Sequence, residues 1–265
     1  MFALAIVVLL LMPPAPDAPL PHRPSALGER LSATQQALDL AIDTWRVQGN
    51  PASGGPPRDV TLYALDQQRI HLLLSARPRL AHTVLRRVPG SVAAHARATI
   101  RARRKVAPLA TPQPRSRFRI GQPKPAGVLR YYREAQRRFG ISWRVLAAVN
   151  LVESAFGRMR NSSTAGAQGP MQFIPSTWAA YGMGGDIRDP HDAILGAANY
   201  LHANGAPRDY GRALYAYNAS RLYVDAVLAY ADRIRRDARN YFAYYAWQVF
   251  VRTPAGVRRI TGPAL

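Results

Sequence analysis

The chain has 265 residues, of which 48% are hydrophobic, so it is long enough for one large or two small domains and is not a disordered chain. Lysine and arginine (36) outnumber acidic residues (15), and the net charge of +21 favours an anionic partner: a nucleic acid, an anionic lipid or an acidic cell-wall polymer. The absence of cysteine excludes disulfides, thiolate metal sites and thiol catalysis.

The chain opens with an apolar run, MFALAIVVLLL, that leads into a proline-rich stretch. This run is too short to span a bilayer and has the length of a signal-peptide core, although no basic segment precedes it. We interpret residues 1–28 as a signal-like segment and proline-rich stretch, and we expect an extracytoplasmic protein, either secreted or bound to the cell envelope. No later stretch predicts a membrane span.

Residues 29–105 form a predicted basic helical region with three helices, at 29–50, 60–76 and 79–105, because apolar residues recur there at helical spacing. From Gln67 to Arg133 there are sixteen lysine and arginine residues and no acidic residue. This basic run is either a solvated surface or a site for anionic wall polymers. Nucleic-acid binding is not expected, since Phe118 is the only aromatic residue among the charges of the linker.

A proline-rich linker at residues 106–125 precedes a second domain at residues 126–240, where helix caps follow one another closely. Ser142, Asp189 and Ser220 stand at predicted helix starts. The C-terminal extension, residues 241–265, is aromatic and basic, and its segment NYFAYYAWQVFV is compatible with a helix or a strand. No convincing strand pattern occurs elsewhere, so the predicted fold is mainly α.

The segment LVESAF places Glu153 in an apolar helical stretch. Helical spacing puts Glu153 on one face with Leu146, Val149 and Phe156. Such neighbours desolvate a carboxylate and raise its pKa, which suits a general acid near neutral pH. The alternative is a glutamate at a helix end that turns to solvent or pairs with Arg158 or Arg160.

Two downstream segments carry polar side chains suited to a sugar. NSSTAGAQGPMQFIPSTW (161–178) is a serine- and glycine-rich loop with Gln172, and LYAYNAS (214–220) places Tyr217 and Asn218 at a corner between helices. Amide and hydroxyl groups near a protonated glutamate match the amide and hydroxyl groups of an acetamido sugar.

Four segments in this order resemble the catalytic domain of lytic transglycosylases, the lysozyme-like enzymes that cleave peptidoglycan. They are ES (153–154), AGAQGPMQFIPSTW (165–178), DPHDAILGAANYL (189–201) and AYN (216–218). These motifs are similar to those of both the membrane-bound transglycosylase B branch and the soluble branch, and the resemblance covers roughly residues 126–237. The resemblance implies a lysozyme-like catalytic domain, here preceded by a small helical region, with peptidoglycan glycan strands as the partner.

The resemblance also implies site residues. Glu153 would be the single catalytic acid/base, Gln172 would contact the acetamido sugar, Tyr217 and Asn218 would line the cleft, and Ser163 would be a further substrate-binding residue. The chain has Pro170 where many relatives have leucine or tyrosine. It lacks the calcium-loop-like insertion of some relatives, so we predict no metal and no cofactor.

The implied reaction cleaves the β-1,4 bond between N-acetylmuramic acid and N-acetylglucosamine and leaves a 1,6-anhydro product. No acidic residue lies between Ser154 and Gly185, so a second carboxylate close in sequence is missing. Alternatives are a lysozyme-type hydrolase that uses Asp186, Asp189 or Asp192, a non-catalytic wall-binding module, and a basic DNA-binding protein.

Overall fold

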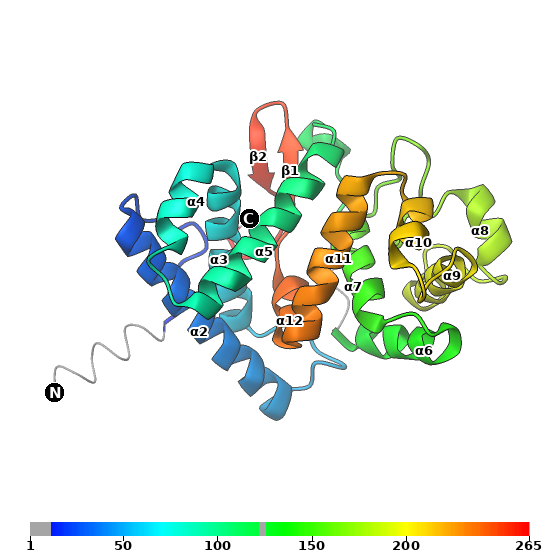
Figure 1. The fold of residues 1–265 in the computed structure, drawn as a ribbon, viewed down its shortest axis with the longest axis horizontal. Helices are drawn as coiled ribbons and strands as arrows, with labels where there is room; N and C mark the ends of the chain where they lie inside the picture. The colour runs from blue at the N-terminus through cyan, green and yellow to red at the C-terminus, as the bar shows by residue number, and fades with distance from the viewer. Residues whose placement is uncertain (1–11, 122–125, 265) are drawn as a thin grey trace.

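The computed structural model describes residues 12–121 and 126–264 as an assembly of helices with one small antiparallel hairpin (Figure 1). The apolar run of the predicted signal-like segment (residues 1–11) and the end of the predicted linker (residues 122–125) lie outside the described residues. The prediction of a mainly α fold is confirmed. No helix within the described ranges is long and apolar enough to cross a membrane.

The described residues of the N-terminal region form four helices; three lie at one end of the molecule, and the fourth runs toward its middle (Figure 1). They are α2 (Pro24–Gln48), α3 (Arg58–Ala76), α4 (Pro78–Leu85) and α5 (Gly90–Val106). Helix α2 begins before the predicted residue 29, because Pro24 is favourable in a first turn. The predicted single helix at 79–105 is wrong: Pro89 lies in extended backbone and separates α4 from α5.

The described part of the predicted linker contains two short 3₁₀ turns, Ala107–Leu109 and Arg115–Arg117. It is tied to the C-terminal hairpin, because the Gln113 amide donates to the Arg252 carbonyl over 3.0 Å. Ile120 forms an isolated antiparallel bridge with Met159. This segment therefore reaches the loop that follows the helix bearing Glu153.

The helices of the second half surround α7 and α11. They are the 3₁₀ turn η3 (Ala126–Val128), α6 (Leu129–Phe139), α7 (Trp143–Ser154), α8 (Pro175–Tyr181), α9 (Pro190–Ala203), α10 (Tyr210–Tyr217) and α11 (Arg221–Arg236). Asp189 and Ser220 cap α9 and α11 through their side chains, as predicted. Ser142 stands at the start of α7 but its side chain makes no cap; its amide donates to the Tyr210 hydroxyl over 2.8 Å.

The aromatic C-terminal segment forms both of the elements that its sequence allowed. It begins as α12 (Arg239–Ala246) and continues into β1 (Phe250–Thr253), which pairs with β2 (Gly256–Arg259) in an antiparallel hairpin. Three tyrosines of α12 are almost completely buried: Tyr241, Tyr244 and Tyr245.

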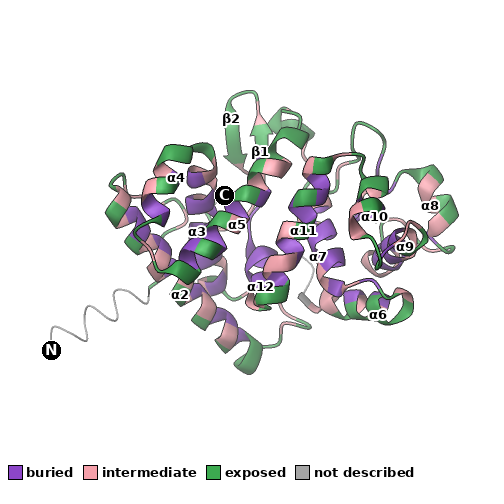
Figure 2. Ribbon diagram, in the orientation of Figure 1, coloured by how far each residue is buried: buried purple, intermediate pink, exposed green. Residues whose placement is uncertain are grey.

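One hydrophobic core continues from the N-terminal helices into the second half. Leu38, Ile42 and Trp45 of α2 belong to the same buried cluster as residues of α7, α9, α11 and α12. Figure 2 marks buried residues on the central helices α7, α11 and α12. The Trp45 and Phe242 rings meet edge to face, with centroids 5.6 Å apart. A smaller separate cluster fills the space among α2 to α5.

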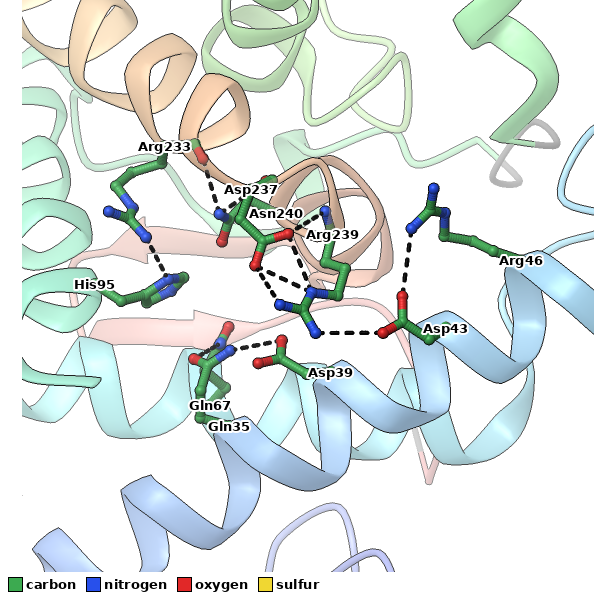
Figure 3. A network of polar contacts seen from close by, with 10 residues as sticks. All are labelled: Gln35, Asp39, Asp43, Arg46, Gln67, His95, Arg233, Asp237, Arg239 and Asn240. Carbon is green, nitrogen blue, oxygen red and sulfur yellow. Dashed lines mark hydrogen bonds and ion pairs between the residues drawn. The ribbon is translucent and has the colours of Figure 1, made fainter. Parts of the chain in front are cut away.

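A polar network lies where the N-terminal helices meet the second half of the chain (Figure 3). Arg239 at the start of α12 donates to the Asp237 carboxylate over 3.0 and 3.1 Å and reaches Asp43 of α2 over 3.3 Å. Arg46 also binds Asp43 over 3.3 Å. The network joins elements far apart in the sequence, so the two halves are linked by both apolar and polar contacts.

A buried histidine pair lies between α3 and α5. His71 and His95 stack with ring centroids 5.8 Å apart, and three of their four ring nitrogens have no hydrogen-bond partner in the described residues. The fourth, His95 Nδ1, lies 3.2 Å from Arg233 Nη2. Burial lowers the pKa of His71 well below its usual value, and burial with the Arg233 charge lowers the pKa of His95 to about 3.

Candidate active site

Helix α7 carries Glu153 on its last turn. The helix lies in the core, with Leu146 and Val149 fully buried, while Glu153 is half-buried. The helix ends at Ser154, so Phe156 does not continue the helical face that the sequence pattern predicted. Phe156 packs instead on Tyr241 and Tyr245 of α12.

The chain leaves α7 through three consecutive residues in the left-handed region. Ala155, Phe156 and Gly157 have φ of 51°, 60° and 78°. Non-glycine residues adopt this conformation at a cost of about 1–2 kcal/mol each, and such strain gathers at functional sites. Amide hydrogen bonds from Ala155 and Phe156 to carbonyls of the last turn of α7 offset part of that cost.

Ser154 holds this turn against the loop that follows it. Its buried hydroxyl accepts from the Gly157 amide over 2.8 Å and lies 2.5 Å from the Pro170 carbonyl, to which it donates. Ser154 was not among the predicted site residues, although a small hydroxyl residue next to the glutamate at a helix end was a signal for it.

The surroundings of Glu153 favour its protonated form. Burial raises the pKa of Glu153 to about 7, and hydrogen bonding to the Tyr223 hydroxyl lowers it by less. The approach of Tyr223 is loose, since its hydroxyl has no partner with strict hydrogen-bond geometry in the described residues. The pKa values of Tyr217 and Tyr223 are raised well above their usual value, first by burial and then by the nearby Glu153 carboxylate. Both hydroxyls therefore stay protonated, as potential donors.

Tyr223 is a site residue that the sequence analysis missed. It lies buried on α11, whose buried side also carries the core tyrosine Tyr230. Its ring is parallel to that of Tyr217, with centroids 6.4 Å apart. Because both tyrosines are buried on the same helix, no local pattern marked Tyr223 as a site residue.

Arginine does not neutralise Glu153. Arg158 is buried and donates to the Trp247 carbonyl over 2.6 Å and to the Tyr245 carbonyl. In the described ranges no ion pair involves Glu153 or Arg160. The alternative in which Glu153 pairs with either arginine is therefore not observed.

Gln172 occupies a strained position in the loop before α8, with φ of 52°. Its Nε2 donates to the carbonyls of Asn161 (3.2 Å) and Gly169 (2.9 Å). A side chain at Gly169 would place Cβ 1.8 Å from the Ile187 carbonyl oxygen, so the loop needs glycine there. The amide group of Gln172 is thus fixed in orientation by the loop.

The other three predicted binding residues differ in their placement. The Tyr217 hydroxyl donates to the Met171 carbonyl over 2.6 Å, next to Gln172, so Tyr217 joins the Gln172 loop to Glu153. Asn218 is exposed at the end of α10. Ser163 is exposed, and its hydroxyl accepts from the amides of Ala165 and Ala167, which closes the loop on itself. The structure brings Glu153, Tyr217 and the Gln172 loop together, whereas no contact joins Ser163 or Asn218 to Glu153 in the described ranges.

The aspartates considered for hydrolysis are engaged elsewhere. Asp189 caps α9, the Asp186 carboxylate accepts from the Arg188 amide, and the Asp192 carboxylate accepts from the Asp186 amide over 2.9 Å. Among the described residues, no hydrogen bond or ion pair links these aspartates to Glu153.

Asp189, His191 and Asp192 place three possible ligand atoms within 4.8 Å of one another. These atoms already contact partners: Asp189 accepts from two backbone amides, and His191 lies within hydrogen-bond distance of Asp192 and Glu134. Exposed groups of this kind are common without an ion. The absence of a metal remains a prediction from the sequence.

The geometry is that of a helical domain with one desolvated glutamate at a helix end. Residues 130–239, which contain all of the site residues described above, match the family model of the Transglycosylase SLT domain. The match covers less than half of the chain and indicates a transglycosylase SLT domain in this part of it, a kind of domain that acts on peptidoglycan. Comparison with curated proteins found no match, and comparison with solved structures found none.

Proposed function

We propose that the protein is a peptidoglycan lytic transglycosylase in which Glu153 is the single general acid and base. The observation that carries the proposal is a carboxyl group whose pKa burial raises to about 7, beside tyrosine hydroxyls and without an ion-pair partner among the described residues. At neutral pH such a group is present in both protonation states, which suits a residue that first donates and then accepts a proton.

The reaction would proceed in two proton transfers. Protonated Glu153 donates to the bridging oxygen, the bond from C1 of N-acetylmuramic acid to that oxygen breaks, and N-acetylglucosamine leaves with a hydroxyl. The acetamido oxygen of the muramic sugar shields the positive charge at C1. The Glu153 carboxylate then removes the proton of the 6-hydroxyl, whose oxygen bonds to C1 and closes the 1,6-anhydro ring. Water is not consumed.

The remaining residues would bind and orient the sugar. Tyr217 and Asn218 would line the cleft, Gln172 would contact the acetamido group with the amide oxygen that its loop leaves unbonded, and Ser163 would contact substrate from its exposed turn. Tyr223 would donate to the Glu153 carboxylate in the second step. The loose approach of its hydroxyl allows this bond to tighten as negative charge develops.

We further propose an extracytoplasmic location and an attachment to anionic wall polymers through the basic helices. Exposed arginines of α4, of α5 and of the turn between them, among them Arg79, Arg86, Arg87 and Arg101, lie in a run without acidic residues. Sedimentation with wall fractions tests the attachment. Stronger binding to polymer-bearing walls than to polymer-free walls is expected, and equal binding would contradict it.

Mass spectrometry of soluble products from purified peptidoglycan tests the reaction. The wild-type protein is expected to release muropeptides lighter by one water than reducing-end forms, Glu153→Gln to release none, and the exposed-site control Glu29→Gln to match wild type. Reducing-end products would show a hydrolase instead. Products from Glu153→Gln would remove Glu153 from its role.

A further inference from the structure

A cavity lies beside the loop that holds Gln172, and Gln168, Gly169 and Pro170 of that loop line it. Its volume is about 700 Å³, and Glu153 is not part of its wall. It lies between Arg117 and Arg119 of the linker, the loop after α7 and the start of α9. The charged side chains that line it are Arg117, Arg119, Arg160, Arg188, Asp186 and Asp189.

The arginines of this cavity are largely unpaired. Arg188 donates to the Gln168 side-chain oxygen over 2.8 Å, whereas the exposed guanidinium groups of Arg117, Arg119 and Arg160 make no ion pair or side-chain hydrogen bond with the described residues. Planar guanidinium groups present paired donors that match a carboxylate. Several of them around one cavity form a receptor for carboxylate groups.

The two aspartates give the cavity a mixed character. Asp186 accepts one backbone amide and Asp189 accepts two, in each case through a single carboxylate oxygen, Oδ1, which leaves the other oxygen of each side chain without a partner in the described ranges. Four arginines against two aspartates leave a net charge of +2. A ligand with carboxylates and an amino group matches both kinds of charge, whereas the aspartates would repel a polymer that carries phosphates alone.

The cavity lies close to Glu153 and is linked to it through a hydrogen bond of the neighbouring residue Ser154. Asn150 lines it and precedes Glu153 by three residues on α7, a rise of about 4.5 Å along the helix. Pro170 also lines the cavity, and its carbonyl accepts from Ser154, the neighbour of Glu153. A ligand in the cavity would therefore contact the loop that orients Gln172.

We propose that this arginine cavity binds the peptide stem carried by the muramic sugar, with stem carboxylates on Arg117, Arg119 and Arg160 and a free stem amino group toward Asp186. The inference rests on the proposed function, since peptidoglycan supplies both the glycan that Glu153 would cleave and the stem. Such stems carry free carboxylates and, at a diamino acid that is not cross-linked, a free amino group. With such a site, the rate of cleavage would depend on the peptide stem as well as on the glycan.

The test compares stem-bearing glycan strands with strands stripped of peptide by an amidase. The variant combines Arg117→Gln, Arg119→Gln and Arg160→Gln. Its control removes the same charge from three exposed arginines outside the cavity, with Arg23→Gln, Arg137→Gln and Arg208→Gln. We expect kcat/KM on stem-bearing strands to fall roughly tenfold in the cavity variant and to stay within about twofold on stripped strands, because exposed charge contacts are individually weak and add here over three residues.

An equal loss on both strand types, or equal losses in the cavity variant and its control, would overturn the proposal. Calorimetry of the free tripeptide L-Ala-γ-D-Glu-diaminopimelate separates this inference from the proposed reaction, because it needs no turnover. Binding by wild type and Glu153→Gln but not by the cavity variant is expected, even if no glycan is cleaved. Inorganic phosphate that binds more tightly than the tripeptide would contradict the proposal.

Discussion

Replacing Glu153 with glutamine should stabilise the protein at alkaline pH and leave it almost unchanged at acid pH. Glutamine keeps the shape and the hydrogen-bonding capacity of a protonated glutamate but does not ionise. The structure places the glutamate where its charged form is desolvated, with its pKa raised from 4.5 to about 7. The comparison of the two side chains therefore measures the free-energy cost of that charge.

The expected size follows from proton linkage. Each unit of pKa corresponds to about 1.4 kcal/mol, so the charged carboxylate is less favourable in the folded than in the unfolded chain by about 3 kcal/mol. A group whose folded pKa is raised contributes stability below its unfolded pKa and loses it as pH rises through the folded pKa. The stability advantage of Glu153→Gln over wild type should therefore grow from near zero at pH 4 to about 3 kcal/mol at pH 8.

Urea unfolding at one-unit pH intervals from 4 to 8 measures this difference for wild type and Glu153→Gln. Glu29→Gln is the matched control for the loss of one carboxyl group, because Glu29 is exposed on α2. A gap between wild type and Glu153→Gln that does not change with pH would refute the assignment of a desolvated carboxyl group. That result would also remove the main support for Glu153 as an acid near neutral pH.

Three further outcomes are expected. Gly169→Ala should lower the free energy of unfolding by at least about 3 kcal/mol, because its Cβ would clash with a carbonyl oxygen. Gly166 has a similar φ but open space around the Cβ position, so Gly166→Ala should lower it by only about 1 kcal/mol. Equal losses in chemical denaturation would contradict the close packing at Gly169. The free energy of unfolding of His71→Phe should rise by about 2 kcal/mol relative to wild type between pH 7 and pH 5, because His71 takes up a proton in the unfolded chain but not in the folded one. A constant difference in the same assay would show that His71 is protonated in the folded protein as well. Ser154→Ala should cost about 2 kcal/mol of stability and lower kcat, since the Pro170 carbonyl and an amide lose a buried partner; unchanged unfolding and turnover would show that the loop is held by other contacts.

Local features of the fold were predictable from the sequence because their causes are local. Asp189 and Ser220 cap helices through side-chain contacts with the next two or three residues, so their pattern is visible in a short window. The half-buried position of Glu153 followed from its apolar neighbours on one helix. The break at Pro89 was missed because apolar residues continue at helical spacing across it, from Leu80 and Val84 to Val92 and Ala96.

The rest of the site depends on contacts between distant segments. Tyr223 meets Glu153 only because α11 packs against α7, and no local pattern distinguishes it from a core tyrosine. The left-handed turn at Ala155 and Phe156 uses residues that rarely adopt positive φ, so the sequence carries no turn signal there. The arginine cavity joins residues from the linker and two separate loops, and their convergence could not be predicted from composition.

The shared core sets how much of this protein a gene fusion would have to carry. Residues 130–239 match a recurring domain, yet Tyr241, Tyr244 and Tyr245, which fill its centre, lie beyond that boundary, and Trp45 reaches the same core from α2. A gene fusion that moved only the matched segment would leave apolar faces of α7 and α11 uncovered. A fusion would have to include the flanking helices and the aromatic C-terminal segment. The smallest part of this protein that can be transferred with its core intact is therefore considerably larger than residues 130–239.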